Sequence, residues 1–211
     1  RVLRLNAVPN PEGLPLDEGL ASRLFKSIGR DVFAPVHRTV AEFLTSRCLA
    51  DRLQEKLTVR RVLALICGSD GGIVSSMRGL AGWLASMSGA ARIPITRLDS
   101  LGVLLYGDAE NFSIAEKSAL IERLGGDIAV SASFRWYERE GRPFAALVTP
   151  EMLPVVNQRL SDADRSENQQ LLVLALLEGL LHAAADTGLT PLLLSMVRDA
   201  SRWPAVRGQA L

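Results

Sequence analysis

The strongest constraint on the fold of this chain is a helix-start signal that recurs along most of its length. In one form, a hydroxyl residue precedes Glu or Gln by three positions, the spacing of a capping box in which each side chain binds a free backbone amide. In the other form, proline follows the hydroxyl residue and suits the first helical turn. Five segments carry a signal: Thr39 with Glu42, Ser113 with Glu116, Thr149 with Pro150, Ser166 with Gln169, and Thr190 with Pro191. Because no strand-like alternation follows residue 36, these signals predict helix after helix with short connections.

Apolar residues at helical spacing define the first helices. The first is expected to run to about Lys56 and to have four apolar residues on one face: Val40, Phe43, Leu44 and Cys48. The segments 59–67 and 73–88 predict two more helices, and Gly125 is expected to end the one that Ser113 begins.

The first 35 residues are the least helical part of the sequence, since prolines and Gly13 interrupt any regular pattern. The stretch SRLFKSIGRDVFAPV, residues 22–36, predicts a β-hairpin with a tight turn at Gly29 and Arg30. The chain is therefore predicted to be all-α: a multi-helical, solenoid-like stack of antiparallel helices with a short β-hairpin near the N-terminus. We expect three parts, a hairpin-bearing segment 1–38 and helical regions 39–125 and 126–211.

Charge and cysteine content exclude several functional classes. The chain has 24 basic and 23 acidic side chains and a formal net charge of +1, so there is no bulk attraction to nucleic acid or to acidic membranes. Cys48 and Cys67 are too few for a disulfide framework or a metal cluster, and they fit buried thiols in a reducing cytoplasm. The most apolar run, 171–185, would form a helix about 22 Å long, short of the roughly 30 Å hydrocarbon core. We expect a buried helix there and no membrane span.

No catalytic centre can be assembled from the sequence. It contains neither a G-x-x-x-x-G-K-[ST] phosphate loop nor an H-E-x-x-H zinc motif, and its serines lack the surroundings of a nucleophile elbow. The glycine-rich stretch 68–72 lacks a lysine and predicts a flexible turn. Of the two histidines, His37 precedes the first predicted helix, and His182 is expected at the edge of a core helix. We therefore expect no catalytic residue, no metal site and no enzymatic activity in this chain.

The ends of the chain indicate a piece of a longer protein. The sequence opens on Arg1, and near its other end Pro204 suits the first position of a helix that stops after a few residues. Val206, Ala210 and Leu211 would then form an apolar stripe without a partner. On this hypothesis, part of the working machinery belongs to a parent protein.

One segment carries a family resemblance. FAPVHRTVAEFLTSRCLADRL, residues 33–53, resembles the segment that closes the winged-helix domain of NACHT-type STAND P-loop ATPases. The pattern is an aromatic or apolar residue, a histidine, a hydroxyl residue two positions later and an E-[FY]-L helix, which here are Phe33, His37, Thr39, Glu42, Phe43 and Leu44. Thr45 and Ser46 depart mildly from the small pair that usually follows.

Weaker similarity extends over most of the chain from about residue 23. Residues 77–87 and 104–124 resemble helical regions that follow this segment in bacterial members of the family. Residues 192–211 resemble a HEAT-type repeat, with four residues at the usual places: Asp199, Pro204, Val206 and Arg207. The resemblance implies that residues 1–38 end a winged-helix-like segment and that 126–211 are HEAT-like repeats cut at their C-terminus.

The resemblance also implies a role for His37. In the family, the winged-helix histidine contacts the β-phosphate of bound ADP in the resting state. A place two residues before the expected helix start, with Arg38 beside it, independently suits an anion. The alternative is that His37 only hydrogen-bonds a backbone carbonyl at the corner between hairpin and helix. The sequence leaves both roles open.

Three functions are therefore considered. The first, implied by the resemblance, is a non-catalytic regulatory and sensing region that couples nucleotide state to recognition of a ligand or partner. ATP or ADP then belongs to the parent protein, and this chain holds no cofactor. The second is a stand-alone α-helical scaffold for protein–protein interaction, and the third is an enzyme with an unrecognised site. We expect a protein partner or other domains of the parent chain, no membrane or nucleic-acid partner, and a cytoplasmic location; the oligomeric state is not defined.

Overall fold

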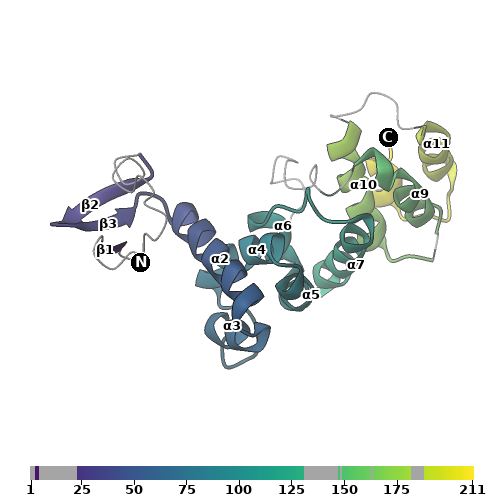
Figure 1. The fold of residues 1–211 in the computed structure, drawn as a ribbon. Helices are drawn as coiled ribbons and strands as arrows, with labels where there is room; N and C mark the ends of the chain where they lie inside the picture. Colours follow the sequence, from purple (N-terminus) through teal and green to yellow (C-terminus); the bar gives the residue numbers. More distant parts are fainter. Residues whose placement is uncertain (1–2, 5–22, 131–146, 148, 163, 182–187) are drawn as a thin grey trace.

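The computed structural model describes residues 3–4, 23–130, 147, 149–162, 164–181 and 188–211. Within them the chain is mostly helical, with a small antiparallel sheet near the N-terminus. Figure 1 shows the sheet at one end of the molecule, the C-terminal helices at the other and the remaining helices between them. The predicted fold class, a multi-helical stack with a short β-hairpin near the N-terminus, is confirmed.

The sheet contains the predicted hairpin. Strands β2 (Phe25–Gly29) and β3 (Val32–Pro35) pair, and a short strand β1 (Leu3–Arg4) lies on the other side of β3. The turn falls one residue later than predicted, at Arg30 and Asp31, and Asp31 has a φ of 56°. Aspartate tolerates this left-handed conformation because its short polar side chain can bond locally.

Helices occupy most of the described chain. In order they are α2 (Arg38–Glu55), α3 (Val59–Ile66), α4 (Arg78–Met87), α5 (Gly89–Leu98), α6 (Ser100–Tyr106), α7 (Ile114–Val130), α9 (Leu153–Ser161), α10 (Glu167–Leu181), α11 (Thr190–Arg198) and α12 (Pro204–Gln209). The 3-10 turns η2 (Ser75–Met77) and η4 (Pro150–Met152) lead directly into α4 and α9. α4 packs against α2, α5 and α6, and α10 packs against α7, α9 and α12. α7 also contacts α5 and α6, so it joins the two groups of helices.

Helix α4 can hold helices on two sides because its buried surface consists mostly of small residues: Gly79, Ala81, Gly82, Leu84 and Ala85. A Cβ added at Gly82 would lie 2.8 Å from the backbone nitrogen of Gly107 and 2.9 Å from the carbonyl oxygen of Gly102. The backbones of α4 and α6 are therefore in contact at this point. On the side of α2, the Ser46 hydroxyl lies 2.7 Å from the carbonyl oxygen of Leu80, so α2 approaches α4 closely as well.

Helix α2 turns a different face toward its neighbours from the one that its sequence predicts. Phe43 is 40% exposed, Leu44 is 41% exposed and Cys48 is exposed, whereas the buried residues of α2 are Ser46 and Ala50. The reason is the closeness of α4, because only small side chains fit between two helix backbones at this separation. Of the four apolar residues predicted on one face, Phe43 contacts Trp83 of α4 but stays 40% exposed, and Leu44 and Cys48 are exposed. The prediction of a buried thiol at Cys48 is wrong.

Two of the predicted capping boxes form. The Ser113 amide donates to the Glu116 carboxylate at 2.8 Å, and the Glu116 amide donates to the Ser113 hydroxyl at 3.3 Å. Ser166 and Gln169 make the equivalent pair of bonds at the start of α10. Gly125 does not end α7, which continues through Gly126 to Val130, because each glycine costs a helix only about 1 kcal/mol and so weakens it without preventing it.

The third predicted capping box, at the start of α2, does not form. The N-cap lies two residues earlier than predicted, at His37 and not at Thr39, and it makes no side-chain cap bond. Glu42 is held by Arg38, whose Nε donates to Oε1 at 2.6 Å. A local competitor for the carboxylate thus removes the reciprocal bonds that the spacing of Thr39 and Glu42 predicts.

The C-terminal apolar residues have a partner. Val206 of α12 is 0% exposed and Ala210 packs against the core, because α12 folds back onto α10 and α11. Arg207 supports this arrangement by donating from Nε to the Val197 carbonyl oxygen at 3.1 Å. The expectation of an unpartnered stripe is wrong for Val206 and Ala210, and only Leu211, 92% exposed, agrees with it.

The most apolar helix, α10, lies in the core as predicted. Five of its apolar residues are at most 4% exposed: Leu172, Val173, Leu174, Leu176 and Leu177. Among the helices of the described residues, none has both the length and the hydropathy needed to cross a bilayer.

Gly82→Ala should destabilise the fold. The added methyl group would meet backbone atoms of Gly107 and Gly102, so we expect a loss of about 1–3 kcal/mol in the free energy of unfolding. Urea denaturation measures this loss. Gly126→Ala is the matched control, because Gly126 lies inside α7 and an added Cβ would have nothing within 4 Å. It should gain about 0.5–1 kcal/mol from helix propensity, and equal effects of the two changes would contradict the close α4–α6 contact.

Ser113→Ala and Thr39→Ala should lower the free energy of unfolding by different amounts. Ser113→Ala removes the hydroxyl of a capping box that forms and should lower the free energy of unfolding by about 1 kcal/mol. Thr39→Ala should change it by less than about 0.5 kcal/mol, since Thr39 is exposed and α2 has no side-chain cap. Thermal denaturation compares the two, and a larger loss for Thr39→Ala would mean that α2 is capped as its sequence predicts.

Candidate functional site

His37 occupies the corner between the hairpin and the helices. It is the N-cap of α2 and has extended backbone, with φ −114° and ψ 143°. Its carbonyl oxygen accepts a bond from the Ala41 amide at 3.4 Å. The side chain is exposed, and among the described residues its imidazole has no hydrogen-bond partner. The imidazole is thus accessible beside the first turn of α2, and the alternative bond to a backbone carbonyl is not found in the described part of the chain.

A cleft of about 560 Å³ opens where α2 and α6 lie on α4. Its walls include Arg38, Thr39 and Glu42 of α2, Trp83 of α4 and Tyr106 of α6. The cleft therefore begins at the residue that follows His37, beside the corner between hairpin and helix.

The Arg38 guanidinium is fixed at the rim of this cleft by two acceptors. Nε donates to Oε1 of Glu42 at 2.6 Å, and Nη2 donates to the Ser76 carbonyl oxygen at 2.6 Å. The Glu42 side chain is 15% exposed and lies over Gly79, where any Cβ would overlap its carboxylate. Gly79 thus lets the carboxylate lie against α4, and the carboxylate in turn orients Arg38.

The two aromatic residues of the cleft are each supported by a neighbour. The Phe43 and Trp83 rings meet edge to face, with centroids 5.2 Å apart and planes at 86°, a geometry that aromatic pairs favour. The guanidinium carbon of Arg78 lies 5.7 Å from the centroid of Tyr106. Arg78 also donates to both carboxylate oxygens of Asp99, at 2.6 and 2.8 Å, and this bond raises the pKa of Arg78. Its charge is therefore retained beside the Tyr106 ring.

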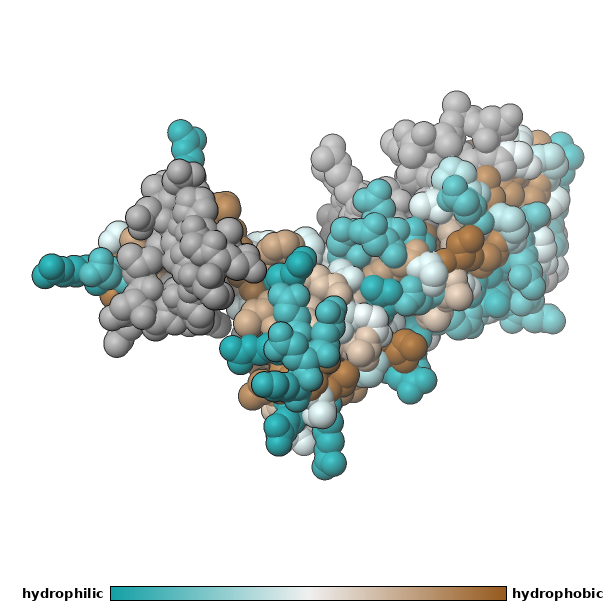
Figure 2. All heavy atoms as spheres, in the orientation of Figure 1, coloured by the Kyte–Doolittle hydropathy of each residue, from teal (hydrophilic) through white to brown (hydrophobic). Residues whose placement is uncertain are grey.

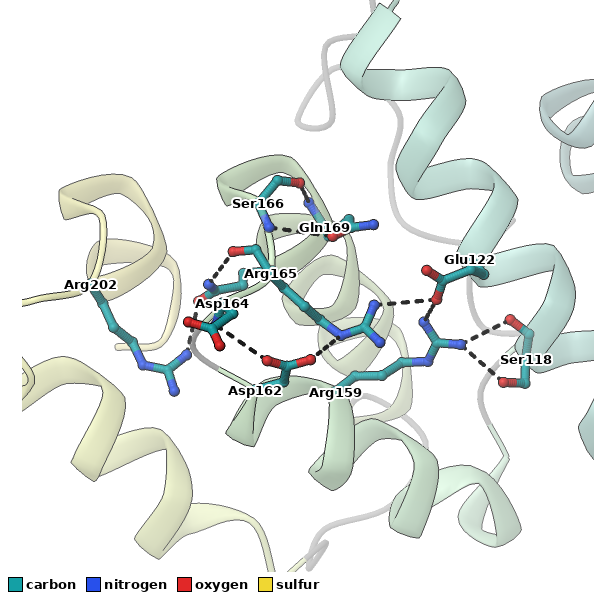
Figure 3. A network of polar contacts seen from close by, with 10 residues as sticks. Ser118, Glu122, Arg159, Asp162, Asp164, Arg165, Ser166, Gln169 and Arg202 are labelled. Atoms are coloured by element: carbon teal, nitrogen blue, oxygen red, sulfur yellow. Dashed lines mark hydrogen bonds and ion pairs between the residues drawn. The ribbon is translucent and has the colours of Figure 1, made fainter.

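A second polar cluster joins α7 to α9 and to the start of α10 (Figure 3). Arg159 of α9 forms an ion pair with Glu122 of α7 and donates to the carbonyl oxygen of Ser118 at 3.1 Å. Arg165 donates to the same glutamate at 3.2 Å and faces Asp162 at 3.3 Å. The bond from Arg159 is the main cause that lowers the pKa of Glu122. Because these charged groups bind one another across neighbouring helices, we assign the cluster to packing and not to a ligand.

The cleft is equipped for binding, and the groups of a catalytic centre are not found in its described walls. No histidine, cysteine or lysine is among its described lining residues, and its carboxylate, Glu42, is engaged with Arg38. Over the same described ranges, no group of three or more His, Cys, Asp or Glu side chains could hold a metal ion. His182 lies outside the described residues, so it is not placed relative to His37. What the cleft offers is a guanidinium, hydroxyl groups and aromatic rings, which can recognise a ligand.

Sequence reasoning identified His37 and Arg38 as neighbours but did not find the cleft. Trp83 lies inside the predicted helix 73–88, at helical spacing with its apolar residues, which favours a place in the core, and nothing in the sequence singles out Tyr106. The available signal was glycine: Gly79 and Gly82 lie inside a predicted helix, and a glycine there indicates that something approaches closely.

Comparisons of this chain with known protein families, with curated proteins and with solved structures found no match. Its function is therefore inferred from its own geometry and from the sequence resemblance of residues 33–53.

Acid should weaken the contact between α7 and α9. A carboxyl group with a lowered pKa stabilises the fold above its unfolded pKa, about 4.3 for glutamate, and this contribution is lost as the pH falls through the folded pKa. Glu122 has such a lowered pKa. The free energy of unfolding should therefore fall more steeply between about pH 5 and pH 3 in the unchanged protein than in Glu122→Gln. The difference should stay below about 1 kcal/mol, since the Glu122 side chain is 50% exposed.

Chemical denaturation at a series of pH values measures this effect. Glu110→Gln is the control, because Glu110 is exposed in the loop before α7 and lies outside the cluster of Figure 3. That variant should keep the acid dependence of the unchanged protein. Identical pH profiles for Glu122→Gln and Glu110→Gln would show that the pair with Arg159 adds no stability.

Proposed function

We propose that this chain is a non-catalytic regulatory and sensing region of a NACHT-type STAND signalling ATPase in the bacterial cytoplasm. It couples the nucleotide state of a P-loop domain in the parent protein to recognition of a ligand or partner. The observation that carries the proposal is the short connection between hairpin and helix, since only Val36 and His37 separate β3 from α2.

Helix α2 is suited to transmit a displacement of the hairpin. It has 18 residues, a length of about 27 Å, and it packs on α4 through the small buried residues Ser46 and Ala50. Closely packed interfaces respond to small shifts by changing between discrete arrangements. A shift of α2 would pass to α4 and, through α6 and α7, to the helices around α10.

His37 supplies the nucleotide contact in this proposal. Its imidazole is accessible, and the first turn of α2 has no side-chain cap. Free amides and the helix dipole favour negative charge at such a place, so the β-phosphate of ADP suits it. In this proposal most contacts to the nucleotide are made by the P-loop domain of the parent protein. The isolated chain should therefore bind ATP or ADP weakly or not at all, and it should not hydrolyse ATP.

The alternative function, a stand-alone α-helical scaffold for protein–protein interaction, is supported by exposed apolar residues. Five of them are between 40% and 52% exposed: Leu24, Ile28, Val36, Phe43 and Leu44. The space-filling view shows hydrophobic residues at the surface where the hairpin meets α2 (Figure 2). Such a surface serves either function, as a contact with the parent's other domains or with a separate protein. A P-loop sequence upstream in the parent protein would favour the first function, and its absence would favour the scaffold.

His37→Ala in the complete parent protein should reduce the retention of ADP in the resting state. Loss of one hydrogen bond to a charged phosphate should weaken retention by about tenfold. The nucleotide released from the denatured protein after purification measures it. The variant should stay folded, because the His37 side chain is exposed and caps nothing.

Lys56→Ala is the matched control, since it removes an exposed cation at the C-cap of the same helix. This variant should retain ADP as the unchanged protein does. If His37→Ala also retains ADP unchanged, the nucleotide role of His37 is excluded.

A further inference from the structure

The cleft between α2, α4 and α6 contains hydrogen-bond donors that have no acceptor within the described part of the chain. Arg38 donates through Nε and Nη2, and within the described chain its Nη1 has no partner. In the same described ranges, neither the hydroxyls of Thr39 and Tyr106 nor the indole nitrogen of Trp83 is hydrogen-bonded. All four residues line one cleft, so a ligand with acceptor oxygens would meet several donors together.

A carboxylate is the group that this arrangement suits best. Arg38 is already oriented by Glu42 and by the Ser76 carbonyl oxygen, so little freedom is lost when Nη1 binds a further acceptor. Bonds from a guanidinium to a carboxylate are charge-assisted and strong. The neighbouring Glu42 would repel a doubly charged phosphate more than a singly charged carboxylate.

The remaining walls of the cleft suit an apolar side chain. The rings of Trp83 and Tyr106 provide large apolar faces. Phe43, 40% exposed, touches Trp83 and extends this apolar surface out of the cleft, and Leu44 beside it is 41% exposed. The apolar surface is therefore longer than the cleft itself.

An extended peptide fits this shape better than a small molecule. Pockets for small molecules bury about 70–90% or more of their ligand, whereas the Arg38 side chain is 58% exposed and Tyr106 is 41% exposed. We propose that the cleft binds an extended segment of a partner protein that carries a carboxylate beside an aromatic or aliphatic side chain. The carboxylate pairs with Arg38, and the apolar side chain packs on Trp83 and Tyr106. The nucleotide role of His37 is not needed for this binding.

An array of immobilised nonapeptides, probed with the full chain, tests the proposal. Its peptides pair Asp or Glu with Phe, Trp or Leu, and matched peptides carry Asn, Gln or Lys in place of the acid. We expect the bound peptides to contain the acidic residue and to lose about tenfold or more in affinity when its amide replaces it. An array without bound peptides, or one in which the amide and lysine versions bind equally well, would overturn the proposal.

Variants of the chain locate the binding. Arg38→Gln should lower the affinity of the chain for the acidic peptide that binds most tightly by about tenfold or more. Arg47→Gln makes the same change on the same helix at an exposed arginine paired with Asp51, outside the described lining of the cleft, and should leave the affinity unchanged. Equal affinities of the two variants would place the peptide elsewhere and refute the cleft.

Thr39→Trp is a second, independent variant. It fills the cleft from an exposed position of α2 and should abolish peptide binding while circular dichroism shows an unchanged helical fold. Undiminished binding by the folded variant would overturn the proposal. These measurements contain no nucleotide, so their failure is distinct from a failure of the proposed regulatory function.

Discussion

The close approach of α2 and α6 to α4 is the contact on which most of the structure depends. Gly82 brings α6 into backbone contact with α4, and Ser46 of α2 donates to the Leu80 carbonyl oxygen of the same helix. Because no long side chain fits between these backbones, the long residues nearby are displaced to the rim. Arg38 and Trp83 are two of them, and the cleft is the space that they enclose with Tyr106. The same packing that joins the helices therefore creates the site.

The two proposed contacts begin at adjacent residues. His37 faces solvent at the N-cap of α2, and Arg38, the first residue of the helix, lines the cleft. A ligand that moves the first turn of α2 would change both positions, since they share one backbone. Two sites that bias one structural element are coupled, and the coupling is reciprocal for binding. In the proposed function, this is the route by which nucleotide state and partner binding would affect each other.

Local interactions could be predicted from the sequence, and interactions that depend on neighbours could not. Ser113 and Glu116 form their capping box because both groups lie within one helical turn and because Arg92, which binds Oε1 of Glu116, leaves Oε2 for the Ser113 amide. At Glu42 the same pattern fails, because Arg38 takes the carboxylate and Gly79 leaves it a place against α4. The spacing of hydroxyl residue and glutamate is the same in both segments. The two segments differ in how a neighbouring arginine holds the glutamate.

By itself the sequence determined the helical class, the hairpin, most helix starts and the place of His37 before a helix, since propensity, capping and turn chemistry act over a few residues. Tertiary structure decided which face of α2 is buried, the burial of Val206 and the grouping of Arg38, Trp83 and Tyr106. Hydrophobicity indicates that a residue gains from burial. Whether it is buried depends on how closely the neighbouring backbone can approach. Here Ser46 and Ala50 are the buried residues of α2, whereas Phe43 contacts the Trp83 ring of α4 and stays 40% exposed, and Leu44 is 41% exposed.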